Sequence, residues 1–225
     1  MKNFLCKLLL LNLLFFGSGL AQEAFFASEV SGVSLSALYA SGKDYKSKGF
    51  AAMLIHKGKF FLGYEHDAAQ IWLKEDDGDY HYKVEQNWDA VYLGVRNFEK
   101  PQRKQYLSFT FQTGFAFSTP DEGVIMRMIP VTVTFFKQLS GKNVKIVPLI
   151  YGTYAYAFIS HQGWKYQTDV ETDYAYGVQL NVVLRPISGL NHGLAFGLDF
   201  NLKNRDVPLS FQFSLVFNAF KSNDK

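Results

Sequence analysis

Five histidines are the side chains in this sequence best suited to acid–base or metal chemistry. They are His56, His66, His81, His161 and His192. None belongs to an HExxH motif, and the single cysteine, Cys6, stands alone near the N-terminus, so no zinc site is predicted. The sequence also lacks a glycine-rich phosphate-binding loop. We therefore predict a protein that works without a metal or cofactor.

One histidine has neighbours that could form a hydrolase site. The residues concerned fall in two segments that are expected to be loops at the same end of the fold predicted below. One loop has Ser160, His161, Asp169 and Asp173, and the other has Ser118 and Asp121. A serine beside a histidine that a carboxylate orients is the arrangement of a nucleophilic hydrolase. The spacing matches no lipase or deacylase motif, and a histidine at a rim is more often simply solvated. A rim-located, lipid-modifying hydrolase is therefore an alternative to a non-enzymatic role.

The first 21 residues have the organisation of a secretory signal peptide. Two lysines precede an apolar run over 8–16. Gly19 and Ala21 then place small residues at positions −3 and −1 of a cleavage site. The apolar run is shorter than the ~20 residues of a membrane-spanning helix, which disfavours an uncleaved anchor. We expect 1–21 to be removed and 22–225 to form a single domain.

Most of the remaining sequence alternates with period two, which predicts β-strands. The clearest segments are 107–118, 174–185, 194–203 and 209–218. They run about 10–14 residues, which exceeds a typical soluble strand and suits a tilted membrane strand. One face is large and aromatic and the other is small and polar, whereas a soluble sandwich packs its large side chains inward. The sequence therefore predicts an all-β fold, an antiparallel transmembrane β-barrel, in preference to a soluble sandwich.

Composition agrees with this fold and argues against nucleic acid as a partner. Aromatic residues make up 17% of the chain, a bias that favours strands and a membrane boundary. The net charge of +3 falls to +1 once Lys2 and Lys7 of the leader are removed. No basic stripe is present, so nucleic-acid binding is not expected.

The alternating segments indicate about 12 strands, with 8 or 10 as alternatives if 49–86 lies partly outside the barrel. Their expected ranges are 31–41, 49–56, 59–66, 69–75, 79–86, 89–98, 105–118, 125–138, 144–160, 173–186, 193–203 and 208–220. An even number is expected of a single-chain bacterial barrel. We expect compact turns at 57–59, 76–78 and 140–143 to share one end, and connections 42–48 and 161–172 to share the outer end.

Polar side chains on the inward face are the main functional candidates. They are Glu65, Lys83, Glu85, Arg96, Gln112, Gln179, Asn181, Arg185, Asp199, Asn201 and Lys203. Such mixed charges could line a passage for small polar solutes. They could equally pair across a closed lumen, because the width of the lumen depends on the strand number.

The leader, the alternation and the last strand together resemble Gram-negative outer-membrane β-barrel proteins. The resemblance covers nearly all of 22–225 as a pattern and identifies no subfamily. It implies a bacterial outer-membrane location, contact with outer-membrane lipids and a terminal strand bound by the barrel-assembly machinery. The residues that match this signal are Phe211, Phe213, Phe217 and Phe220. The chain departs from the commonest form because five residues, 221–225, follow the last aromatic.

We therefore expect an outer-membrane barrel, foremost a small porin-like channel for polar solutes. A non-conducting structural or surface-binding barrel is the first alternative, and the rim hydrolase is the second.

Overall fold

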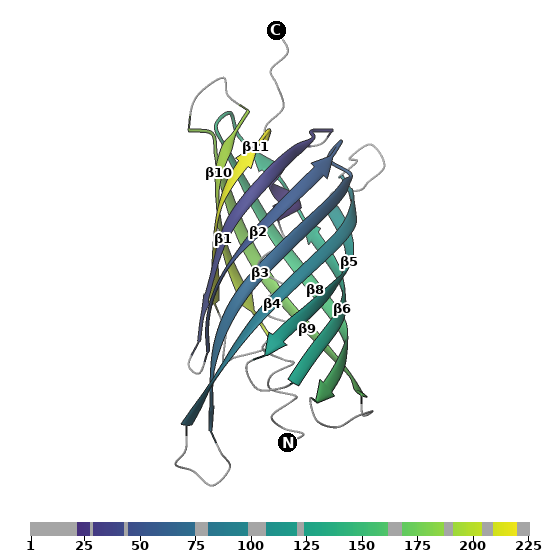
Figure 1. Cartoon of the computed structure of the whole chain (residues 1–225). Coiled ribbons are helices and arrows are strands. Elements are labelled where there is room, and N and C mark those ends of the chain that lie inside the picture. The colour runs from purple at the N-terminus through teal and green to yellow at the C-terminus, as the bar shows by residue number, and fades with distance from the viewer. Residues whose placement is uncertain are drawn as a thin grey trace.

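The computed structural model forms one closed, antiparallel β-barrel (Figure 1). It describes residues 22–27, 29–42, 45–74, 81–98, 107–120, 124–161, 168–186, 191–203 and 209–219. The wall strands are β1 (Gly32–Ser41), β2 (Tyr45–His56), β3 (Phe60–Lys74), β4 (His81–Asn97), β5 (Ser108–Pro120), β6 (Val124–Phe136), β8 (Val144–His161), β9 (Thr168–Leu184), β10 (Gly193–Asn201) and β11 (Leu209–Phe217). A short 3-10 helix, η1 (Gln22–Phe25), precedes them, and a two-residue strand, β7 (Leu139–Ser140), pairs only with β8. The all-β, transmembrane-type fold expected from the sequence is confirmed.

Sequence neighbours pair around most of the ring, and two further pairings close it. β6 pairs with β8 across the short β7, and β1 pairs with β11, with Val33 opposite Phe217. The described residues thus give ten wall strands and leave no free edge in the wall. None of the helices in these residues has the length and hydrophobicity needed to cross a bilayer.

The strand number is ten because two pairs of expected strands are continuous. The segments 59–66 and 69–75 are both part of β3, and 79–86 and 89–98 are both part of β4. The turn sequence 76–78, which follows β3, lies outside the described residues. The ten-strand alternative therefore holds, and the even number is kept.

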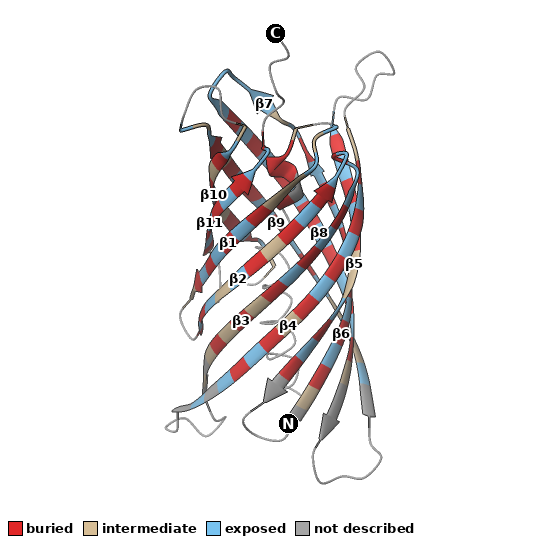
Figure 2. Cartoon of the chain, turned by 45° about the horizontal axis from the view of Figure 1, so that its top comes forward, coloured by how far each residue is buried: buried red, intermediate tan, exposed pale blue. Residues whose placement is uncertain are grey.

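Burial alternates along every wall strand, as the striped colouring in Figure 2 shows. Outward positions carry large apolar side chains, and the rows of Phe and Leu on β5, β10 and β11 are exposed, as predicted. Inward positions carry many buried Ser, Thr, Gln, Asn and Ala residues, also as predicted. The inward face additionally holds buried aromatics such as Tyr45, Tyr92 and Trp88, which a rule of small, polar inward residues did not anticipate.

Glycines in β3 and β4 make room for two of the inward aromatic rings. Gly63 faces Tyr92 and Gly94 faces Phe61 in the register of these strands. A Cβ added at Gly63 would lie 2.1 Å from the Tyr92 ring, and one at Gly94 would lie 2.2 Å from the Phe61 ring. Each ring therefore lies across a position that only glycine can occupy without a shift.

The two ends of the barrel differ. We call the end where β1 begins and β11 ends the plug end, and the opposite end the hairpin end. β3, β4, β8 and β9 have 15–18 residues, against nine in β10 and β11. In Figure 1 the β3–β4 pair extends beyond its neighbours at the hairpin end.

The outward apolar band stops before these extensions. On β3 and β4 the outward residues change from apolar to polar at Tyr64, whose hydroxyl donates a hydrogen bond to Asp89. His66 Nδ1 lies 3.0 Å from the same carboxylate, and the Phe50 ring packs against both Tyr64 and His66. An aromatic and polar rim of this kind is typical of the boundary between lipid and water.

Candidate functional site

Seven of the eleven inward candidates are buried on the inner face of the wall. They are Glu65, Arg96, Gln112, Gln179, Asn181, Asp199 and Asn201, with 0–9% of their surface exposed. The candidate site is therefore a set of polar side chains that are buried on the inner face of the wall.

Lys83 and Glu85 do not belong to this interior. Their side chains are 42% and 52% exposed and form an ion pair with each other. In the continuous β4 the buried positions run from Gln86 to Arg96 in steps of two, so odd-numbered residues face outward. Because 79–86 was treated as a separate strand, its inward and outward positions were not set by those of 89–98. The inward prediction for Lys83 and Glu85 is therefore wrong.

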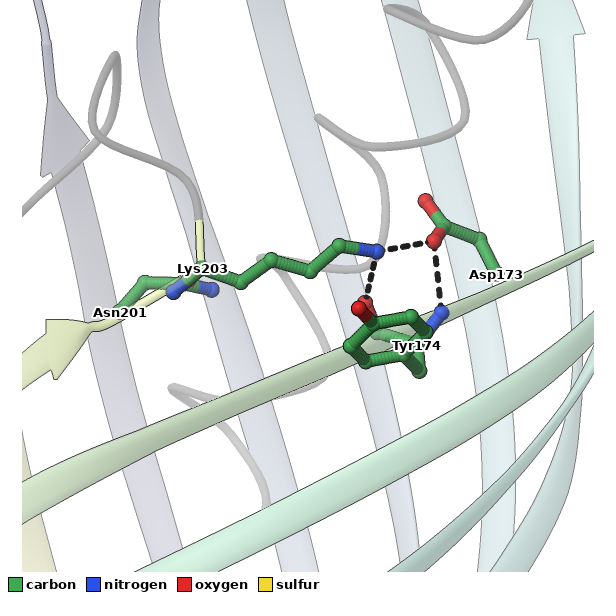
Figure 3. A network of polar contacts seen from close by, with 4 residues as sticks. All are labelled: Asp173, Tyr174, Asn201 and Lys203. Carbon is green, nitrogen blue, oxygen red and sulfur yellow. Dashed lines mark hydrogen bonds and ion pairs between the residues drawn. The ribbon is translucent and has the colours of Figure 1, made fainter.

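Arg185 and Lys203 lie just past the ends of their strands. Arg185 follows β9 and is half-buried at the plug end. Lys203 follows β10 at the hairpin end, where Nζ forms an ion pair with Asp173 and donates a hydrogen bond of 2.6 Å to the Tyr174 carbonyl (Figure 3). Nζ also lies 3.6 Å from the centroid of the Tyr174 ring. Lys203 thus fixes β10 to β9 at the hairpin end of the barrel.

The middle of the lumen contains short hydrogen-bonded networks. Asp199 lies opposite Gln179 in the register of β9 and β10. One Asp199 carboxylate oxygen accepts from the Tyr151 hydroxyl at 3.2 Å and from Ser210 Oγ at 3.4 Å. Gln179 Nε2 donates to Asn181 Oδ1 at 2.9 Å. The Asp199 contacts join β8, β10 and β11, whereas the Gln179–Asn181 bond lies within β9.

Two other networks join neighbouring strands. Ser36 on β1 lies 2.7 Å from Ser214 on β11, hydroxyl to hydroxyl, and accepts a 3.0 Å hydrogen bond from Gln212 Nε2. Thr132 and Thr153 pair their hydroxyls at 2.8 Å between β6 and β8. Both networks lie at the two pairings that close the ring, β1–β11 and β6–β8. Buried hydroxyl groups that pair across these two junctions favour this one closure over others.

The plug end is filled by the chain's own N-terminal segment, residues 22–27, which we call the plug. Gln22, Ala24, Phe25 and Phe26 have no exposed surface. In Figure 1 the η1 part of the plug lies inside the barrel near the plug end. Phe25 and Phe26 pack in a buried cluster with residues of β2, β3, β4, β9, β10 and β11. Apolar side chains thus close this end from the inside.

Polar wall residues bind the plug through its backbone. Arg96 Nη2 donates to the carbonyls of Phe26 and Ala27 at 2.9 and 3.3 Å, and its Nε donates to Gly58 O at 3.0 Å. Gln138 Nε2 donates to the carbonyls of Ala24 and Phe26 at 2.7 and 2.6 Å. Charged and amide donors therefore satisfy carbonyls that would otherwise be buried without partners.

Lys145 connects the plug to the other end of the chain. Its Nζ donates to Phe25 O at 3.2 Å and also to the carbonyl of Ala219, just after β11. Ala27 N donates directly to the same Ala219 carbonyl at 3.1 Å. The plug is thus held by the wall and by the end of the last strand.

The sequence prediction did not include Gln22, Gln138 or Lys145, and it assigned no interior role to the plug. Lys145 shares its phase on β8 with Val147, Leu149 and Tyr151, all buried. A rule that equates the inward face with polar residues fails on such a strand. Continuing the alternation from the polar Thr153 back to Lys145 would have found it.

The hydrolase residues are only partly described. Ser118 is buried on the inward face of β5, where it accepts a 3.1 Å hydrogen bond from Met126 N, so it is not on an outer loop. Asp173 is paired with Lys203. Asp121 lies outside the described residues, as do the side chains of Ser160, His161 and Asp169. Within the described part of the chain, no group of three or more His, Cys, Asp or Glu side chains could hold a metal ion.

The aromatic residues of the last strand face outward. Phe211, Phe213 and Phe217 are 46%, 42% and 41% exposed on β11, and Phe220 lies outside the described residues. They form a continuous apolar row beside β10, where Phe196 packs on Phe213 with ring centroids 5.2 Å apart. Recognition of this row by an assembly machinery remains a prediction.

Similarity to known proteins is found in structure and not in sequence. No protein-family model and no curated protein matches the sequence. Among solved structures, the β-domain of the autotransporter BrkA from Bordetella is similar, with a TM-score of 0.48 and 11% sequence identity over 84% of this chain and 99% of that domain. No function is carried over from that domain.

Proposed function

We propose that this chain is a bacterial outer-membrane β-barrel protein whose lumen is closed, so that it serves as a structural or surface-binding barrel. The supporting observation is the plug, because Phe25 and Phe26 fill one end of a lumen whose other inward side chains are buried as well. A passive channel needs a continuous water path, and packed apolar rings interrupt such a path.

The location rests on the two faces of the wall. The exposed aromatic and aliphatic band is suited to lipid, and the rim at Tyr64, His66 and Asp89 is suited to a headgroup region. Within this proposal, residues 1–21 are the cleaved leader and β11 is the strand bound by the barrel-assembly machinery. Outer-membrane lipids are then the immediate partners.

The test is single-channel conductance of the folded, detergent-purified protein in a planar bilayer at several salt concentrations. We expect no steady steps, with folding shown by a heat-dependent shift in electrophoretic mobility. Steps that scale with salt would overturn the closed barrel and establish the porin-like channel instead.

The porin-like channel is the second candidate, favoured by polar inward atoms without protein partners. Gln179 Oε1, Asn181 Nδ2 and Gln212 Oε1 are buried and make no hydrogen bond within the described residues. Water inside the lumen would satisfy them. If this candidate holds, polar solutes would pass only when the plug leaves its site.

A further inference from the structure

The inner wall of β3 and β4 presents four buried acceptor oxygens that have no donor. Both carboxylate oxygens of Glu65, Oδ1 of Asp67 and Oε1 of Gln86 make no hydrogen bond in the described residues. These side chains are only 3%, 2% and 3% exposed. Buried polar atoms are rarely left without a partner, so this concentration of acceptors calls for a ligand that can bind oxygen.

The three side chains occupy adjacent positions on the wall. Glu65 and Asp67 are two residues apart and point to the same side of β3. Asp67 lies opposite Trp88, and the next inward pair along the strands is Ala69 with Gln86. The oxygens therefore come from consecutive rungs of one hairpin.

Small residues flank the carboxylates on the neighbouring strands. Glu65 has Ala51 on one side and Ala90 on the other. Asp67 lies between Gly49 on β2 and the larger Trp88 on β4, and a Cβ added at Gly49 would lie 2.7 Å from Asp67 Oδ1. Asp67 Oδ1 thus lies over a glycine of β2.

No positive group of the described chain neutralises this pair. Neither Glu65 nor Asp67 takes part in any ion pair among the described residues. The inward cations Arg96 and Lys145 donate to backbone carbonyls of the plug, of Gly58 and of Ala219. Two buried carboxylates without a counter-charge are strongly unfavourable, so a cation or protons must accompany them.

We propose that Glu65, Asp67 and Gln86 form a Ca²⁺ site inside the barrel wall. Hard oxygen ligands suit Ca²⁺ or Mg²⁺, and the two carboxylates balance a charge of two. Glu65 can bind through both oxygens, a mode that Ca²⁺ accepts readily, whereas Mg²⁺ requires a tighter octahedral shell. Water completes the coordination, because the described residues supply only two acidic ligands.

The site has a built-in reporter in Trp88. Its ring is 4% exposed and stands in the same rung as Asp67. Binding of Ca²⁺ to Asp67 therefore changes the surroundings of the indole. The inference does not depend on whether the lumen conducts, so the two proposals can fail separately.

The experiment uses the full folded protein in detergent, stripped with EGTA and titrated with CaCl₂ or MgCl₂. Thermal unfolding and tryptophan fluorescence are both followed. At a hundredfold excess over Kd, we expect Ca²⁺ to raise the unfolding temperature by roughly 5–10 °C. Mg²⁺ should do less, and Trp88→Phe should abolish the fluorescence change while keeping the thermal shift.

Charge-removing variants locate the site. Glu65→Gln and Asp67→Asn keep the side-chain shapes and should remove the Ca²⁺ response. Asp199→Asn is the matched control, because Asp199 is equally buried but its carboxylate accepts hydrogen bonds from Tyr151 and Ser210. It should keep the full response.

Three results would overturn the proposal. The first is a wild-type protein whose stability and fluorescence ignore Ca²⁺. The second is a Glu65→Gln protein that still responds. The third is a pair of variants that are more stable than wild type with or without Ca²⁺, which would mean that the carboxyl groups are held protonated. If neither variant folds, the wild-type and Trp88→Phe titrations decide alone.

Discussion

The fit of Tyr92 over Gly63 gives a prediction whose size can be worked out from the structure. The ring is 1% exposed and belongs to the buried cluster that contains Phe25 and Phe26. In Gly63→Ala the new methyl group would lie 2.1–2.5 Å from three atoms of the Tyr92 side chain. Contacts that short cannot persist, so the ring must move and disturb its packing against the plug.

The expected cost follows from two opposing effects. Overpacking a core typically costs about 1–3 kcal/mol. Replacing glycine by alanine also narrows the unfolded ensemble, which returns about 0.4–1 kcal/mol. We therefore expect Gly63→Ala to lower the free energy of unfolding by about 1–2 kcal/mol, or roughly 2–8 °C in unfolding temperature.

Gly152→Ala is the matched control for this prediction. Gly152 lies on the outward face of β8, and a Cβ there would meet nothing within 4 Å. The same chemical change should leave stability unchanged or raise it by up to about 1 kcal/mol. The two variants thus share the glycine effect and differ in the clash.

The assay is equilibrium unfolding in urea, with folding and unfolding shown to be reversible. Tyr92→Ala removes the ring, so adding Gly63→Ala to it should cost nothing further. The interaction energy from this double-mutant cycle should be about 1–3 kcal/mol. If Gly63→Ala equals Gly152→Ala, or costs the same with and without Tyr92, the reasoning is refuted.

Three further predictions concern the plug and the rim. Arg96→Ala removes donors to three carbonyls and should lower the free energy of unfolding by about 2–5 kcal/mol. It should also make the plug more susceptible to limited proteolysis. Unchanged protection of the plug would contradict the anchoring role of Arg96. Phe26→Ala empties a fully buried site and should cost about 3–5 kcal/mol, measured by the same urea unfolding. Lys203→Met should cost about 1–3 kcal/mol, because its ion pair with Asp173 is at the rim but only 19% and 16% exposed, and the difference should shrink as salt is raised. A difference independent of salt would show that packing on Tyr174 dominates.

The two faces of the wall could be predicted from the sequence because period-two alternation is a direct consequence of strand geometry. On β10 and β11 every residue alternates without interruption, and both strands were located to within a few residues.

The strand number and two site residues could not be predicted for a local reason. In β3 the outward face changes from apolar Leu62 and Tyr64 to polar His66 and Gln70 as the strand leaves the band. The two faces of the strand are then both polar, and in the sequence this resembles the end of a strand. The backbone continues because hydrogen bonding to β4 does not depend on side-chain polarity. Lys83 and Glu85 were misplaced for the same reason.

The plug could not be predicted because its contacts are not local. Its backbone carbonyls bind Arg96, Gln138 and Lys145, which are 69 to 120 residues away along the chain. Nothing in the six plug residues signals these partners. Only the closed ring brings the three donors to one end.

The contact of both chain ends with Lys145 has a kinetic consequence. β1 and β11 pair residues that lie 168 to 184 positions apart, which makes this the longest-range strand pairing in the described barrel. A ring closed by one seam could reopen by fraying from its last strand. Here the end of β11 can leave only if the Ala219 carbonyl also gives up Lys145 and the amide of Ala27. The plug thus also stabilises the pairing of β1 with β11. We expect it to lower the rate at which the barrel opens more than it raises the rate at which the barrel closes.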